Sequence, residues 1–289
     1  MAEKDLSEKY LEEYPDVFAD IVNVLLLGKD YIRPDELYSG PTESIYKAES
    51  GLAEKEQRRD ISKYFIRDSK IMALIGIENQ SYADCNMPVR VMGYDYASYR
   101  SQIINDRGRY PVITLVLNFT NNKWDSPVSL KDYPEYHEKL HEFIPDYRIR
   151  IINVAYIPEN VRMKLKSDFK IIADFFTERR KKGRYIPTDE QIKHEMAVLY
   201  MLRVFTGDER YEQIKKNIKK RKAKGEVVTM CTFADEMENK GISKGRIMEA
   251  VSIYSQEMHL NNKDVLNRIM QKFGLKSDEA RRYIESGIV

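Results

Sequence analysis

Three polar residues close a long apolar run in the first third of the chain. Residues 71–77 are wholly apolar, and Glu78, Asn79 and Gln80 follow them directly. A run of this kind is typical of a buried strand, and a carboxylate at its end is costly to bury unless it is paired or binds a metal. Glu78 is therefore a candidate for chemistry.

A second acid, Asp60, begins the strand-like segment that comes before this run. The pattern predicts two strands, 60–66 and 71–80, joined by a turn at 67–70. If the strands pair antiparallel, Asp60 lies opposite Glu78, and two oxygen ligands on rigid strands are what Mg²⁺ requires. Asp60 also fits another interpretation, because an aspartate at the start of a strand commonly caps a turn.

The residues after Gln80 carry a family resemblance. Asp60, the triplet Glu78-Asn79-Gln80 and the segment MPVRVMGYDYASYRSQ over residues 87–102 resemble the Rpn family, the recombination-promoting nucleases or putative transposases of the PD-(D/E)XK nuclease superfamily. The superfamily motif is an Asp, a strand and then Asp/Glu-x-Lys, so Gln80 stands where Lys is usual. The resemblance runs from about residue 18 to about residue 208.

This resemblance implies a mixed α/β, restriction-endonuclease-like fold with an αβββαβ core and a helical C-terminal extension. It also implies metal-dependent hydrolysis of DNA phosphodiester bonds, with Asp60, Glu78 and Gln80 as catalytic residues. Asp60, Glu78 and the Asn79 carbonyl would hold Mg²⁺, for which Mn²⁺ is a substitute, and no organic cofactor is expected. The first helix of such folds often sends an acid toward the metal, which makes Asp20 a further ligand candidate. A solvated helix charge is the other interpretation of Asp20.

Other elements are expected from periodicity and from turn residues. Apolar residues at helical spacing predict helices, and β-branched or alternating apolar runs predict strands, whereas recurring Pro and Gly predict a loop with at most one short strand. The expected helices are 17–27, 88–105 and 190–206, the further strands are 110–120 and 148–157, and the loop is 28–56.

Two groups of basic or polar residues are candidates for contact with DNA. On the helix over 88–105, Arg90 has the forked geometry that suits phosphate, and Gln102 continues its polar line. Arg90 could instead fix the helix to the sheet. Residues 210–224 carry eight Lys and Arg against Glu212, net +7, and include Lys219, Lys220 and Arg221. Such a segment either binds phosphates in a salt-dependent way or is a solvated basic helix or linker.

A metal site of another kind is a weaker alternative. His137 and His141 stand four residues apart, which on a helix would place both imidazoles on one side. No third ligand pattern stands near them in the sequence.

Composition limits the remaining choices. The net charge is only +2, so any attraction to nucleic acid must come from local patches. Two cysteines without zinc or disulfide spacing favour a reducing, cytoplasmic setting. No apolar run approaches the length of about 18 residues that spans a membrane.

We expect three regions: a nuclease-like domain over 1–207, a basic helical linker over 208–239 and a small helical tail over 240–289. Cutting both strands of a duplex generally needs two sites, so a homodimer is an expected partner arrangement beside DNA itself. The missing Lys leaves a second function open, that of a catalytically weak or inactive nuclease-fold protein that binds nucleic acid or another partner.

Overall fold

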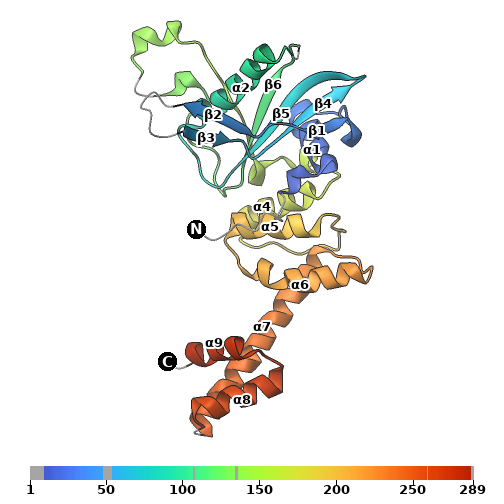
Figure 1. Ribbon diagram of the computed structural model, residues 1–289, viewed down its shortest axis with the longest axis vertical. Coiled ribbons are helices and arrows are strands. Elements are labelled where there is room, and N and C mark those ends of the chain that lie inside the picture. Colours follow the sequence, from blue (N-terminus) through green and yellow to red (C-terminus); the bar gives the residue numbers. More distant parts are fainter. Residues whose placement is uncertain (1–9, 48–53, 107, 134–135, 259, 288–289) are drawn as a thin grey trace. The chain divides into compact units, whose positions relative to one another are not determined.

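The structure is a computed structural model that describes residues 10–47, 54–106, 108–133, 136–258 and 260–287 (Figure 1). The chain divides into two compact units. Unit 1 is Met1–Ile186 with Ile192–Asp208, and unit 2 is Pro187–Gln191 with Glu209–Val289. Unit 1 ends at Asp208, one residue after the expected end of the first domain at residue 207. Residues 187–191, however, group with unit 2.

Unit 1 is built around a five-stranded mixed sheet. In spatial order its strands are β1 (Leu37–Ser39), β4 (Ile61–Arg67), β5 (Lys70–Gln80), β6 (Val112–Asn118) and β7 (Arg150–Asn153). The pairs β1–β4 and β4–β5 are antiparallel, whereas β5–β6 and β6–β7 are parallel. A separate hairpin, β2 (Glu43–Lys47) with β3 (Glu54–Arg58), stands between β1 and β4 in the chain.

Two helices complete the order expected for the fold. Helix α1 (Pro15–Ile21) precedes β1, and helix α2 (Met87–Ile104) lies between β5 and β6. Apart from the inserted hairpin, the chain therefore runs α-β-β-β-α-β, and the fold is a mixed α/β one consistent with the restriction-endonuclease-like class.

The register of β4 against β5 is fixed by a tight turn. Asp68 and Ser69 both have positive φ, 50° and 60°, as the central residues of a two-residue type I′ hairpin require. The turn pairs Arg67 with Lys70, and a bulge between Phe65 and Ile66 then shifts the register by one residue, so that Ile61 lies opposite Ile77. A slip of one residue would move every β5 side chain to the other face of the sheet.

Helices cover both faces of this sheet. Met87 of α2 packs against Val116 of β6. Because strand side chains alternate, Leu115 points away from α2, and it lines a pocket together with Leu25 of η2 (Val22–Leu27), the π-helical continuation of α1. The sheet is therefore the middle of three layers.

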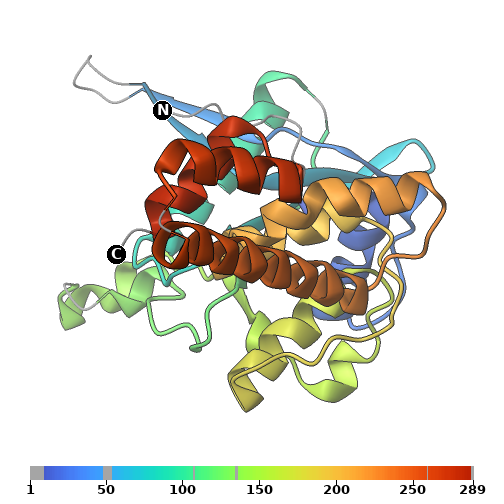
Figure 2. The same cartoon turned by 90° about the horizontal axis from the view of Figure 1, so that it is seen from below.

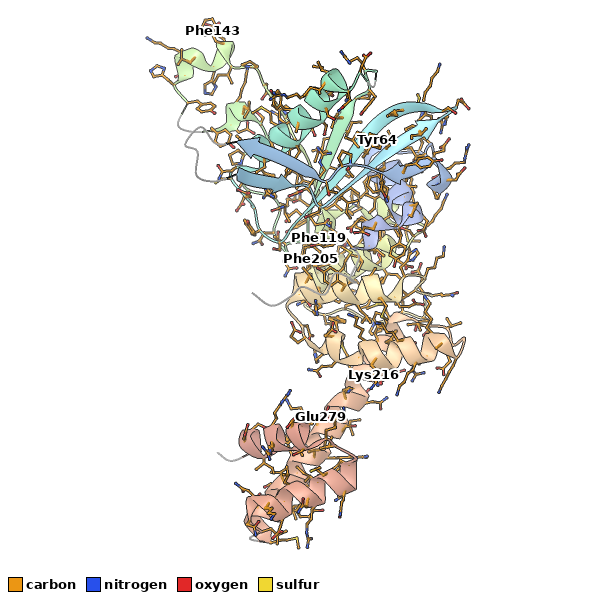
Figure 3. All side chains as sticks on the ribbon, in the orientation of Figure 1. Tyr64, Phe119, Phe143, Phe205, Lys216 and Glu279 are labelled. Atoms are coloured by element: carbon orange, nitrogen blue, oxygen red, sulfur yellow. The ribbon has the colours of Figure 1, made fainter. Side chains whose placement is uncertain are left out.

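Shorter helices and two longer ones complete unit 1. Phe119, just after β6, stacks on Phe205 of α5 with ring centroids 4.2 Å apart and also contacts Phe176 of α4 (Figure 3). Helices α4 and α5 therefore pack at this end of the sheet. The remaining helices are η1 (Leu11–Glu13), η3 (Pro34–Glu36), η4 (Leu130–Asp132), η5 (Glu138–Phe143), η6 (Val154–Tyr156), α3 (Glu159–Arg162), α4 (Phe169–Lys182) and α5 (Glu195–Thr206).

Several expected boundaries were wrong. The expected loop over 28–56 contains β1, β2 and the start of β3, while its residues 48–53 lie outside the described chain. The strand expected over 148–157 ends at Asn153, because Val154 and Ala155 turn into η6 and are fully buried. The helix expected from residue 190 begins only at Glu195, since the preceding backbone is held by the Asp168 carboxylate.

Every regular element among the described residues of unit 2 is a helix. Its helices are α6 (Arg210–Ala223), α7 (Met230–Ser252), the π-helical η7 (Ile253–Glu257), α8 (Asn262–Phe273) and α9 (Ser277–Gly287). Figures 1 and 2 show α7 as one long continuous helix. It runs through the boundary expected between residues 239 and 240, so the tail is continuous with the segment that was expected to be a linker.

A small core of its own holds the end of unit 2 together. Val251, Val265, Ile269, Ala280 and Ile284, from α7, α8 and α9, are all at most 5% exposed. Among the residues that the structure describes, no helix in either unit is long and apolar enough to cross a membrane.

Gly76 in β5, the central strand of the sheet, provides a test of the packing against Arg59. A Cβ at this position would lie 2.7 Å from Nε and 2.9 Å from Nη1 of Arg59, which is buried and cannot swing away. We expect Gly76→Ala to lower the free energy of unfolding by about 1–3 kcal/mol, as overpacking does. Urea denaturation measures this change.

Gly241→Ala is the matched control. A Cβ at Gly241 meets nothing within 4 Å, and alanine is favoured over glycine inside a helix such as α7. Gly241→Ala should leave stability unchanged or raise it. Equal effects of the two substitutions would contradict the packing argument.

Candidate active site

Asp60 and Glu78 lie at one end of the β4–β5 pair and are joined through backbone amides. The Asp60 N–H donates to Glu78 Oε2 at 3.3 Å, and the Asn79 N–H donates to Asp60 Oδ2 at 2.8 Å. The Gln80 amide donates to Glu78 Oε1 at 3.4 Å. The structure therefore places together the four residues that the motif singled out.

Glu78 is almost fully buried, with 1% of its surface exposed. Burial is the largest cause that raises its pKa to about 7, and the negative charge of Asp60 adds to it, while Arg90 acts in the opposite direction. A carboxyl with this pKa exchanges its proton near neutral pH. Its affinity for a cation should therefore depend on pH in that range.

Arg90 supplies the positive charge beside Glu78. Its Nη2 donates to Glu78 Oε1 at 2.6 Å and to the Tyr94 hydroxyl at 3.3 Å, and its Nη1 donates to Asp84 Oδ2 at 2.9 Å. The Arg90 side chain is 29% exposed, so it reaches solvent as well as both carboxylates. Arg90 thus places a cation near the Glu78 carboxylate, in a motif that has Gln80 in place of Lys.

Glu12 is a third acid at this site, and the sequence did not single it out. It lies in η1, is fully buried, and neither carboxylate oxygen has a hydrogen-bond partner among the described residues. Its pKa is raised to about 7, first by burial and then by the charge of Asp60, while the Asn79 side chain acts to lower it. No periodicity marks Glu12, because it stands in a short acidic segment ahead of the first helix.

Asp20 is not the helix acid of this site, contrary to the expectation. Its Oδ2 accepts hydrogen bonds from the backbone N–H groups of Lys166 and Ser167 and from the Ser167 hydroxyl, all at 2.7–2.8 Å. Its carboxylate is therefore satisfied by the segment ahead of α4. The alternative of a solvated charge was wrong too, since Asp20 is only 9% exposed.

Two tyrosines border the acids. Tyr10, just before η1, meets Tyr200 of α5 edge to face, with ring centroids 5.3 Å apart. Burial raises the pKa of the Tyr10 hydroxyl, and the nearby charge of Asp60 raises it further. Tyr10 therefore keeps its proton and offers a neutral O–H donor near the carboxylates.

A buried ion pair lies beneath the site. Arg59 is 3% exposed and donates from Nη2 to Asp95 Oδ1 at 2.8 Å. Asp95, on α2, also accepts from the hydroxyls of Thr114 at 2.7 Å and Tyr147 at 2.5 Å. Because Arg59 is the neighbour of Asp60 in the chain, this network holds the backbone from which the catalytic candidate extends.

The acids suit a divalent metal by their chemistry. Carboxylate oxygens are the donors that Mg²⁺ and Mn²⁺ prefer, and the unpartnered, buried carboxylate of Glu12 lacks a compensating charge. Among the described residues no three His, Cys, Asp or Glu are already gathered closely enough to hold an ion. The zinc alternative at His137 and His141 likewise finds no third ligand there.

The expected DNA contacts fare differently from one another. Gln102 is 1% exposed and exchanges two hydrogen bonds with the Tyr110 backbone, so it is a structural residue and cannot face DNA. Lys219 and Lys220 are exposed on α6. Arg221 is engaged instead by Glu236 at 2.7 Å and by Glu226 at 2.9 Å, which fastens α6 to α7.

Comparison with known proteins finds one family model that matches the middle of the chain. Residues 67–204 match the model described as "Putative transposase, YhgA-like". This stretch is similar to the YhgA-like putative transposases. The resemblance stated from the MPVR segment is thereby confirmed, over a narrower range than expected, and Glu78, Gln80 and Arg90 fall inside it. No curated protein and no solved structure matches the chain.

Glu12 predicts how stability depends on pH when no metal is present. Its pKa is about 7 in the folded protein against an ordinary 4.5, so the unfolded chain binds fewer protons between these values. Its contribution to stability is present below about pH 4.5 and is lost as pH rises to about 7. We expect Glu12→Gln to raise the free energy of unfolding at pH 8 by roughly 2 kcal/mol, with little change at pH 4.5.

Urea denaturation in the presence of a chelator measures both values. Asp125→Asn, at an exposed acid of the same unit, is the control and should show no such difference between the two pH values. An equal gain for Glu12→Gln at pH 4.5 and pH 8 would mean that the charge of Glu12 is not the cause.

Proposed function

We propose that this chain is a metal-dependent DNA endonuclease that hydrolyses phosphodiester bonds in recombination or transposition. The matching family model supports a link to transposition, and its fold is consistent with that of nucleases. The observation that carries the proposal is the meeting of Asp60 and Glu78 at one end of β4 and β5, with the buried Glu12 close enough to Asp60 for that charge to raise its pKa. Carboxylates held near one another, two of them buried, cost folding free energy unless a cation balances them.

Mg²⁺, with Mn²⁺ as a substitute, is the proposed cofactor. Asp60 and Glu78 would hold it, together with the backbone carbonyl of Asn79, and the nearby Glu12 would add negative charge beside it. When bound, the ion neutralises the scissile phosphate and lowers the pKa of a water so that it becomes a nucleophile.

Gln80 and Arg90 divide the work of the Lys that the superfamily motif usually has. The Gln80 amide is already directed at Glu78 and can orient a water by hydrogen bonding, although it carries no charge. Arg90 carries the charge and keeps part of its surface in solvent. Its fork can donate to a phosphate oxygen while it remains near Glu78.

DNA is the proposed substrate, and unit 2 supports its attraction. Unit 2 contains 17 Lys and Arg against 14 Asp and Glu, net +3, although the whole chain has only +2. Lys219 and Lys220 are exposed on α6 and are the proposed phosphate contacts. Such contacts carry no sequence information and weaken as salt rises.

Plasmid nicking tests the nuclease directly. We expect wild type to nick DNA with Mg²⁺ or Mn²⁺ and to lose this activity on chelation. Asp60→Ala, Glu78→Ala and Glu12→Gln should each lose about 100-fold or more, because each removes a charge that the cation needs. Asp125→Asn, which changes an exposed acid of the same unit, is the control and should cut normally.

The alternative function has an observation of its own. Arg90 occupies Glu78 Oε1 in the way that a purely structural ion pair would, and Gln80 lacks the charge of the motif Lys. A protein of this kind would bind nucleic acid without cutting it. No cleavage by wild type, together with DNA retained in a gel shift, would establish this alternative and reject the nuclease.

A second experiment separates the roles of Gln80 and Arg90. We expect Arg90→Ala to lower the cleavage rate by one or two decades and Gln80→Ala to lower it less, because only the arginine carries charge. Gln80→Lys should restore part of the rate lost in Arg90→Ala. Single-turnover cleavage measures these rates. If substitutions of Gln80 leave the rate unchanged both in the wild-type protein and in Arg90→Ala, Gln80 has no role in the mechanism.

A further inference from the structure

An arm between β6 and β7, residues 136–146, carries exposed apolar side chains. Leu140 is 56% exposed and Phe143 is 72% exposed. They lie three residues apart in the 3₁₀-helix η5, a spacing that puts both side chains on the same side. Figure 3 places Phe143 at the end of the arm, away from the sheet. A pair of neighbouring, exposed apolar residues on a projecting segment is typical of a contact surface.

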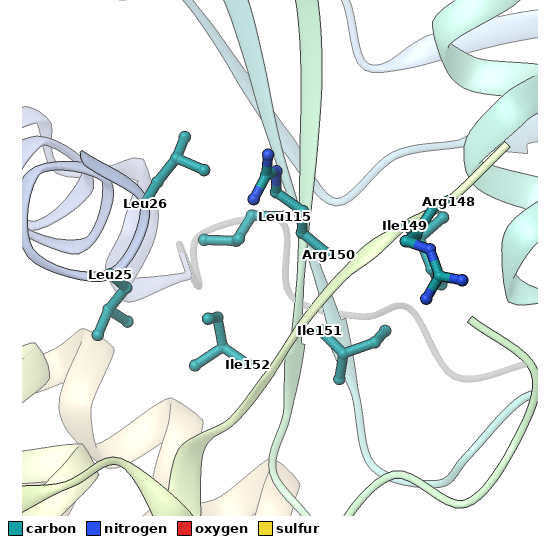
Figure 4. Close-up of a pocket in the computed structure, with 8 residues that line it drawn as sticks. All are labelled: Leu25, Leu26, Leu115, Arg148, Ile149, Arg150, Ile151 and Ile152. Carbon is teal, nitrogen blue, oxygen red and sulfur yellow. The ribbon is translucent and has the colours of Figure 1, made fainter. Parts of the chain in front are cut away.

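An open pocket of about 390 Å³ lies elsewhere on unit 1, between β7 and η2 (Figure 4). Leu25, Leu26 and Ile152 line it and are only half-buried, with Leu115 beneath them. β7 is the last strand of the sheet, so no further strand covers this edge. The pocket is therefore a hollow with aliphatic side chains and two arginines, Arg148 and Arg150, in its lining, which the described residues of its own chain leave unfilled.

Charges on the two features are opposite. Glu138 and Glu142 flank the apolar residues of the arm, whereas Arg148 and Arg150 stand among the residues that line the pocket. All four of these residues are exposed, and none of the four side chains has an ion pair within the described part of the chain. Four charges without partners are thus divided into one acidic and one basic pair.

We propose that the arm and the pocket of unit 1 together form an interface between two copies of the chain. Each copy places its arm against the pocket of the other, with Leu140 and Phe143 on Leu25, Leu26 and Ile152. A second copy is the occupant that the chain itself specifies, because both halves of the apolar and charge match are present on it. If the two copies exchange arms about a two-fold axis, both arms and both pockets are occupied, and the assembly closes as a dimer.

The charge pairs give a decisive experiment on the full-length protein. Variant A is Glu138→Arg with Glu142→Arg, and variant B is Arg148→Glu with Arg150→Glu. Each alone sets like charges against each other, so we expect the dissociation constant of the dimer to rise about tenfold or more. An equal mixture of A and B has two matched contacts and should associate as wild type does. Sedimentation velocity over a range of concentrations measures all of these.

Two further variants complete the design. Phe143→Ser removes an apolar contact from an exposed position and should weaken the dimer without affecting folding, which circular dichroism checks. Asp125→Arg with Arg109→Glu reverses two other exposed charges of unit 1 and should leave the dimer intact. A monomeric wild type, variants that dimerise unchanged, or a mixture of A and B that stays apart would each overturn the proposal. These outcomes do not depend on whether the protein cuts DNA.

Discussion

The repulsion between carboxylates that have been removed from water is the constraint on which the site depends. Glu12, Asp60 and Glu78 are brought together where burial raises the pKa of Glu12 and Glu78 to about 7. Backbone amides hold Asp60 and Glu78 in place because the antiparallel register of β4 and β5 leaves no other position for them. The tight turn at the far end of the hairpin is therefore part of the site, although it lies at a distance from it.

Helix α2 contributes two kinds of residue to this site, apolar residues that pack on the sheet and an arginine that pairs with Glu78. Met87 and Val91 pack on the sheet and fix the helix, while Arg90 turns a positive charge toward Glu78. One turn further along, Asp95 holds Arg59, the residue next to Asp60. The segment that carries the family resemblance is thus a packing surface and a set of charges at once, which explains why its residues are found together.

The sequence was sufficient where a local pattern decides the outcome. The apolar run before Glu78 and the turn at residues 67–70 predict a hairpin, and the hairpin predicts that Asp60 and Glu78 meet. Glu12 was out of reach, because one glutamate among many in a short acidic segment gains its role only from long-range packing. Asp20 was wrong for the same reason: it lies on the expected helix, but its partners come from the segment near residue 167.

Burial misled the sequence-based interpretation at two other places. In the sequence Gln102 continues a polar line on α2, yet its side-chain amide is buried and exchanges hydrogen bonds with the Tyr110 backbone. In the sequence Arg221 is equivalent to its lysine neighbours, yet in the structure it forms ion pairs with Glu236 and Glu226. A run of like side chains gives no sign of which member meets an acid on the next helix.

The contact between Arg59 and Gly76 links two positions that selection cannot change independently. The guanidinium lies where any side chain at residue 76 would begin. A larger residue there can be accepted only after residue 59 has become shorter, and a shorter residue 59 leaves Asp95 without its cation. The path from this sequence to one with a different charge under the site therefore passes through intermediates that fold poorly, which tends to preserve the arrangement in descendants.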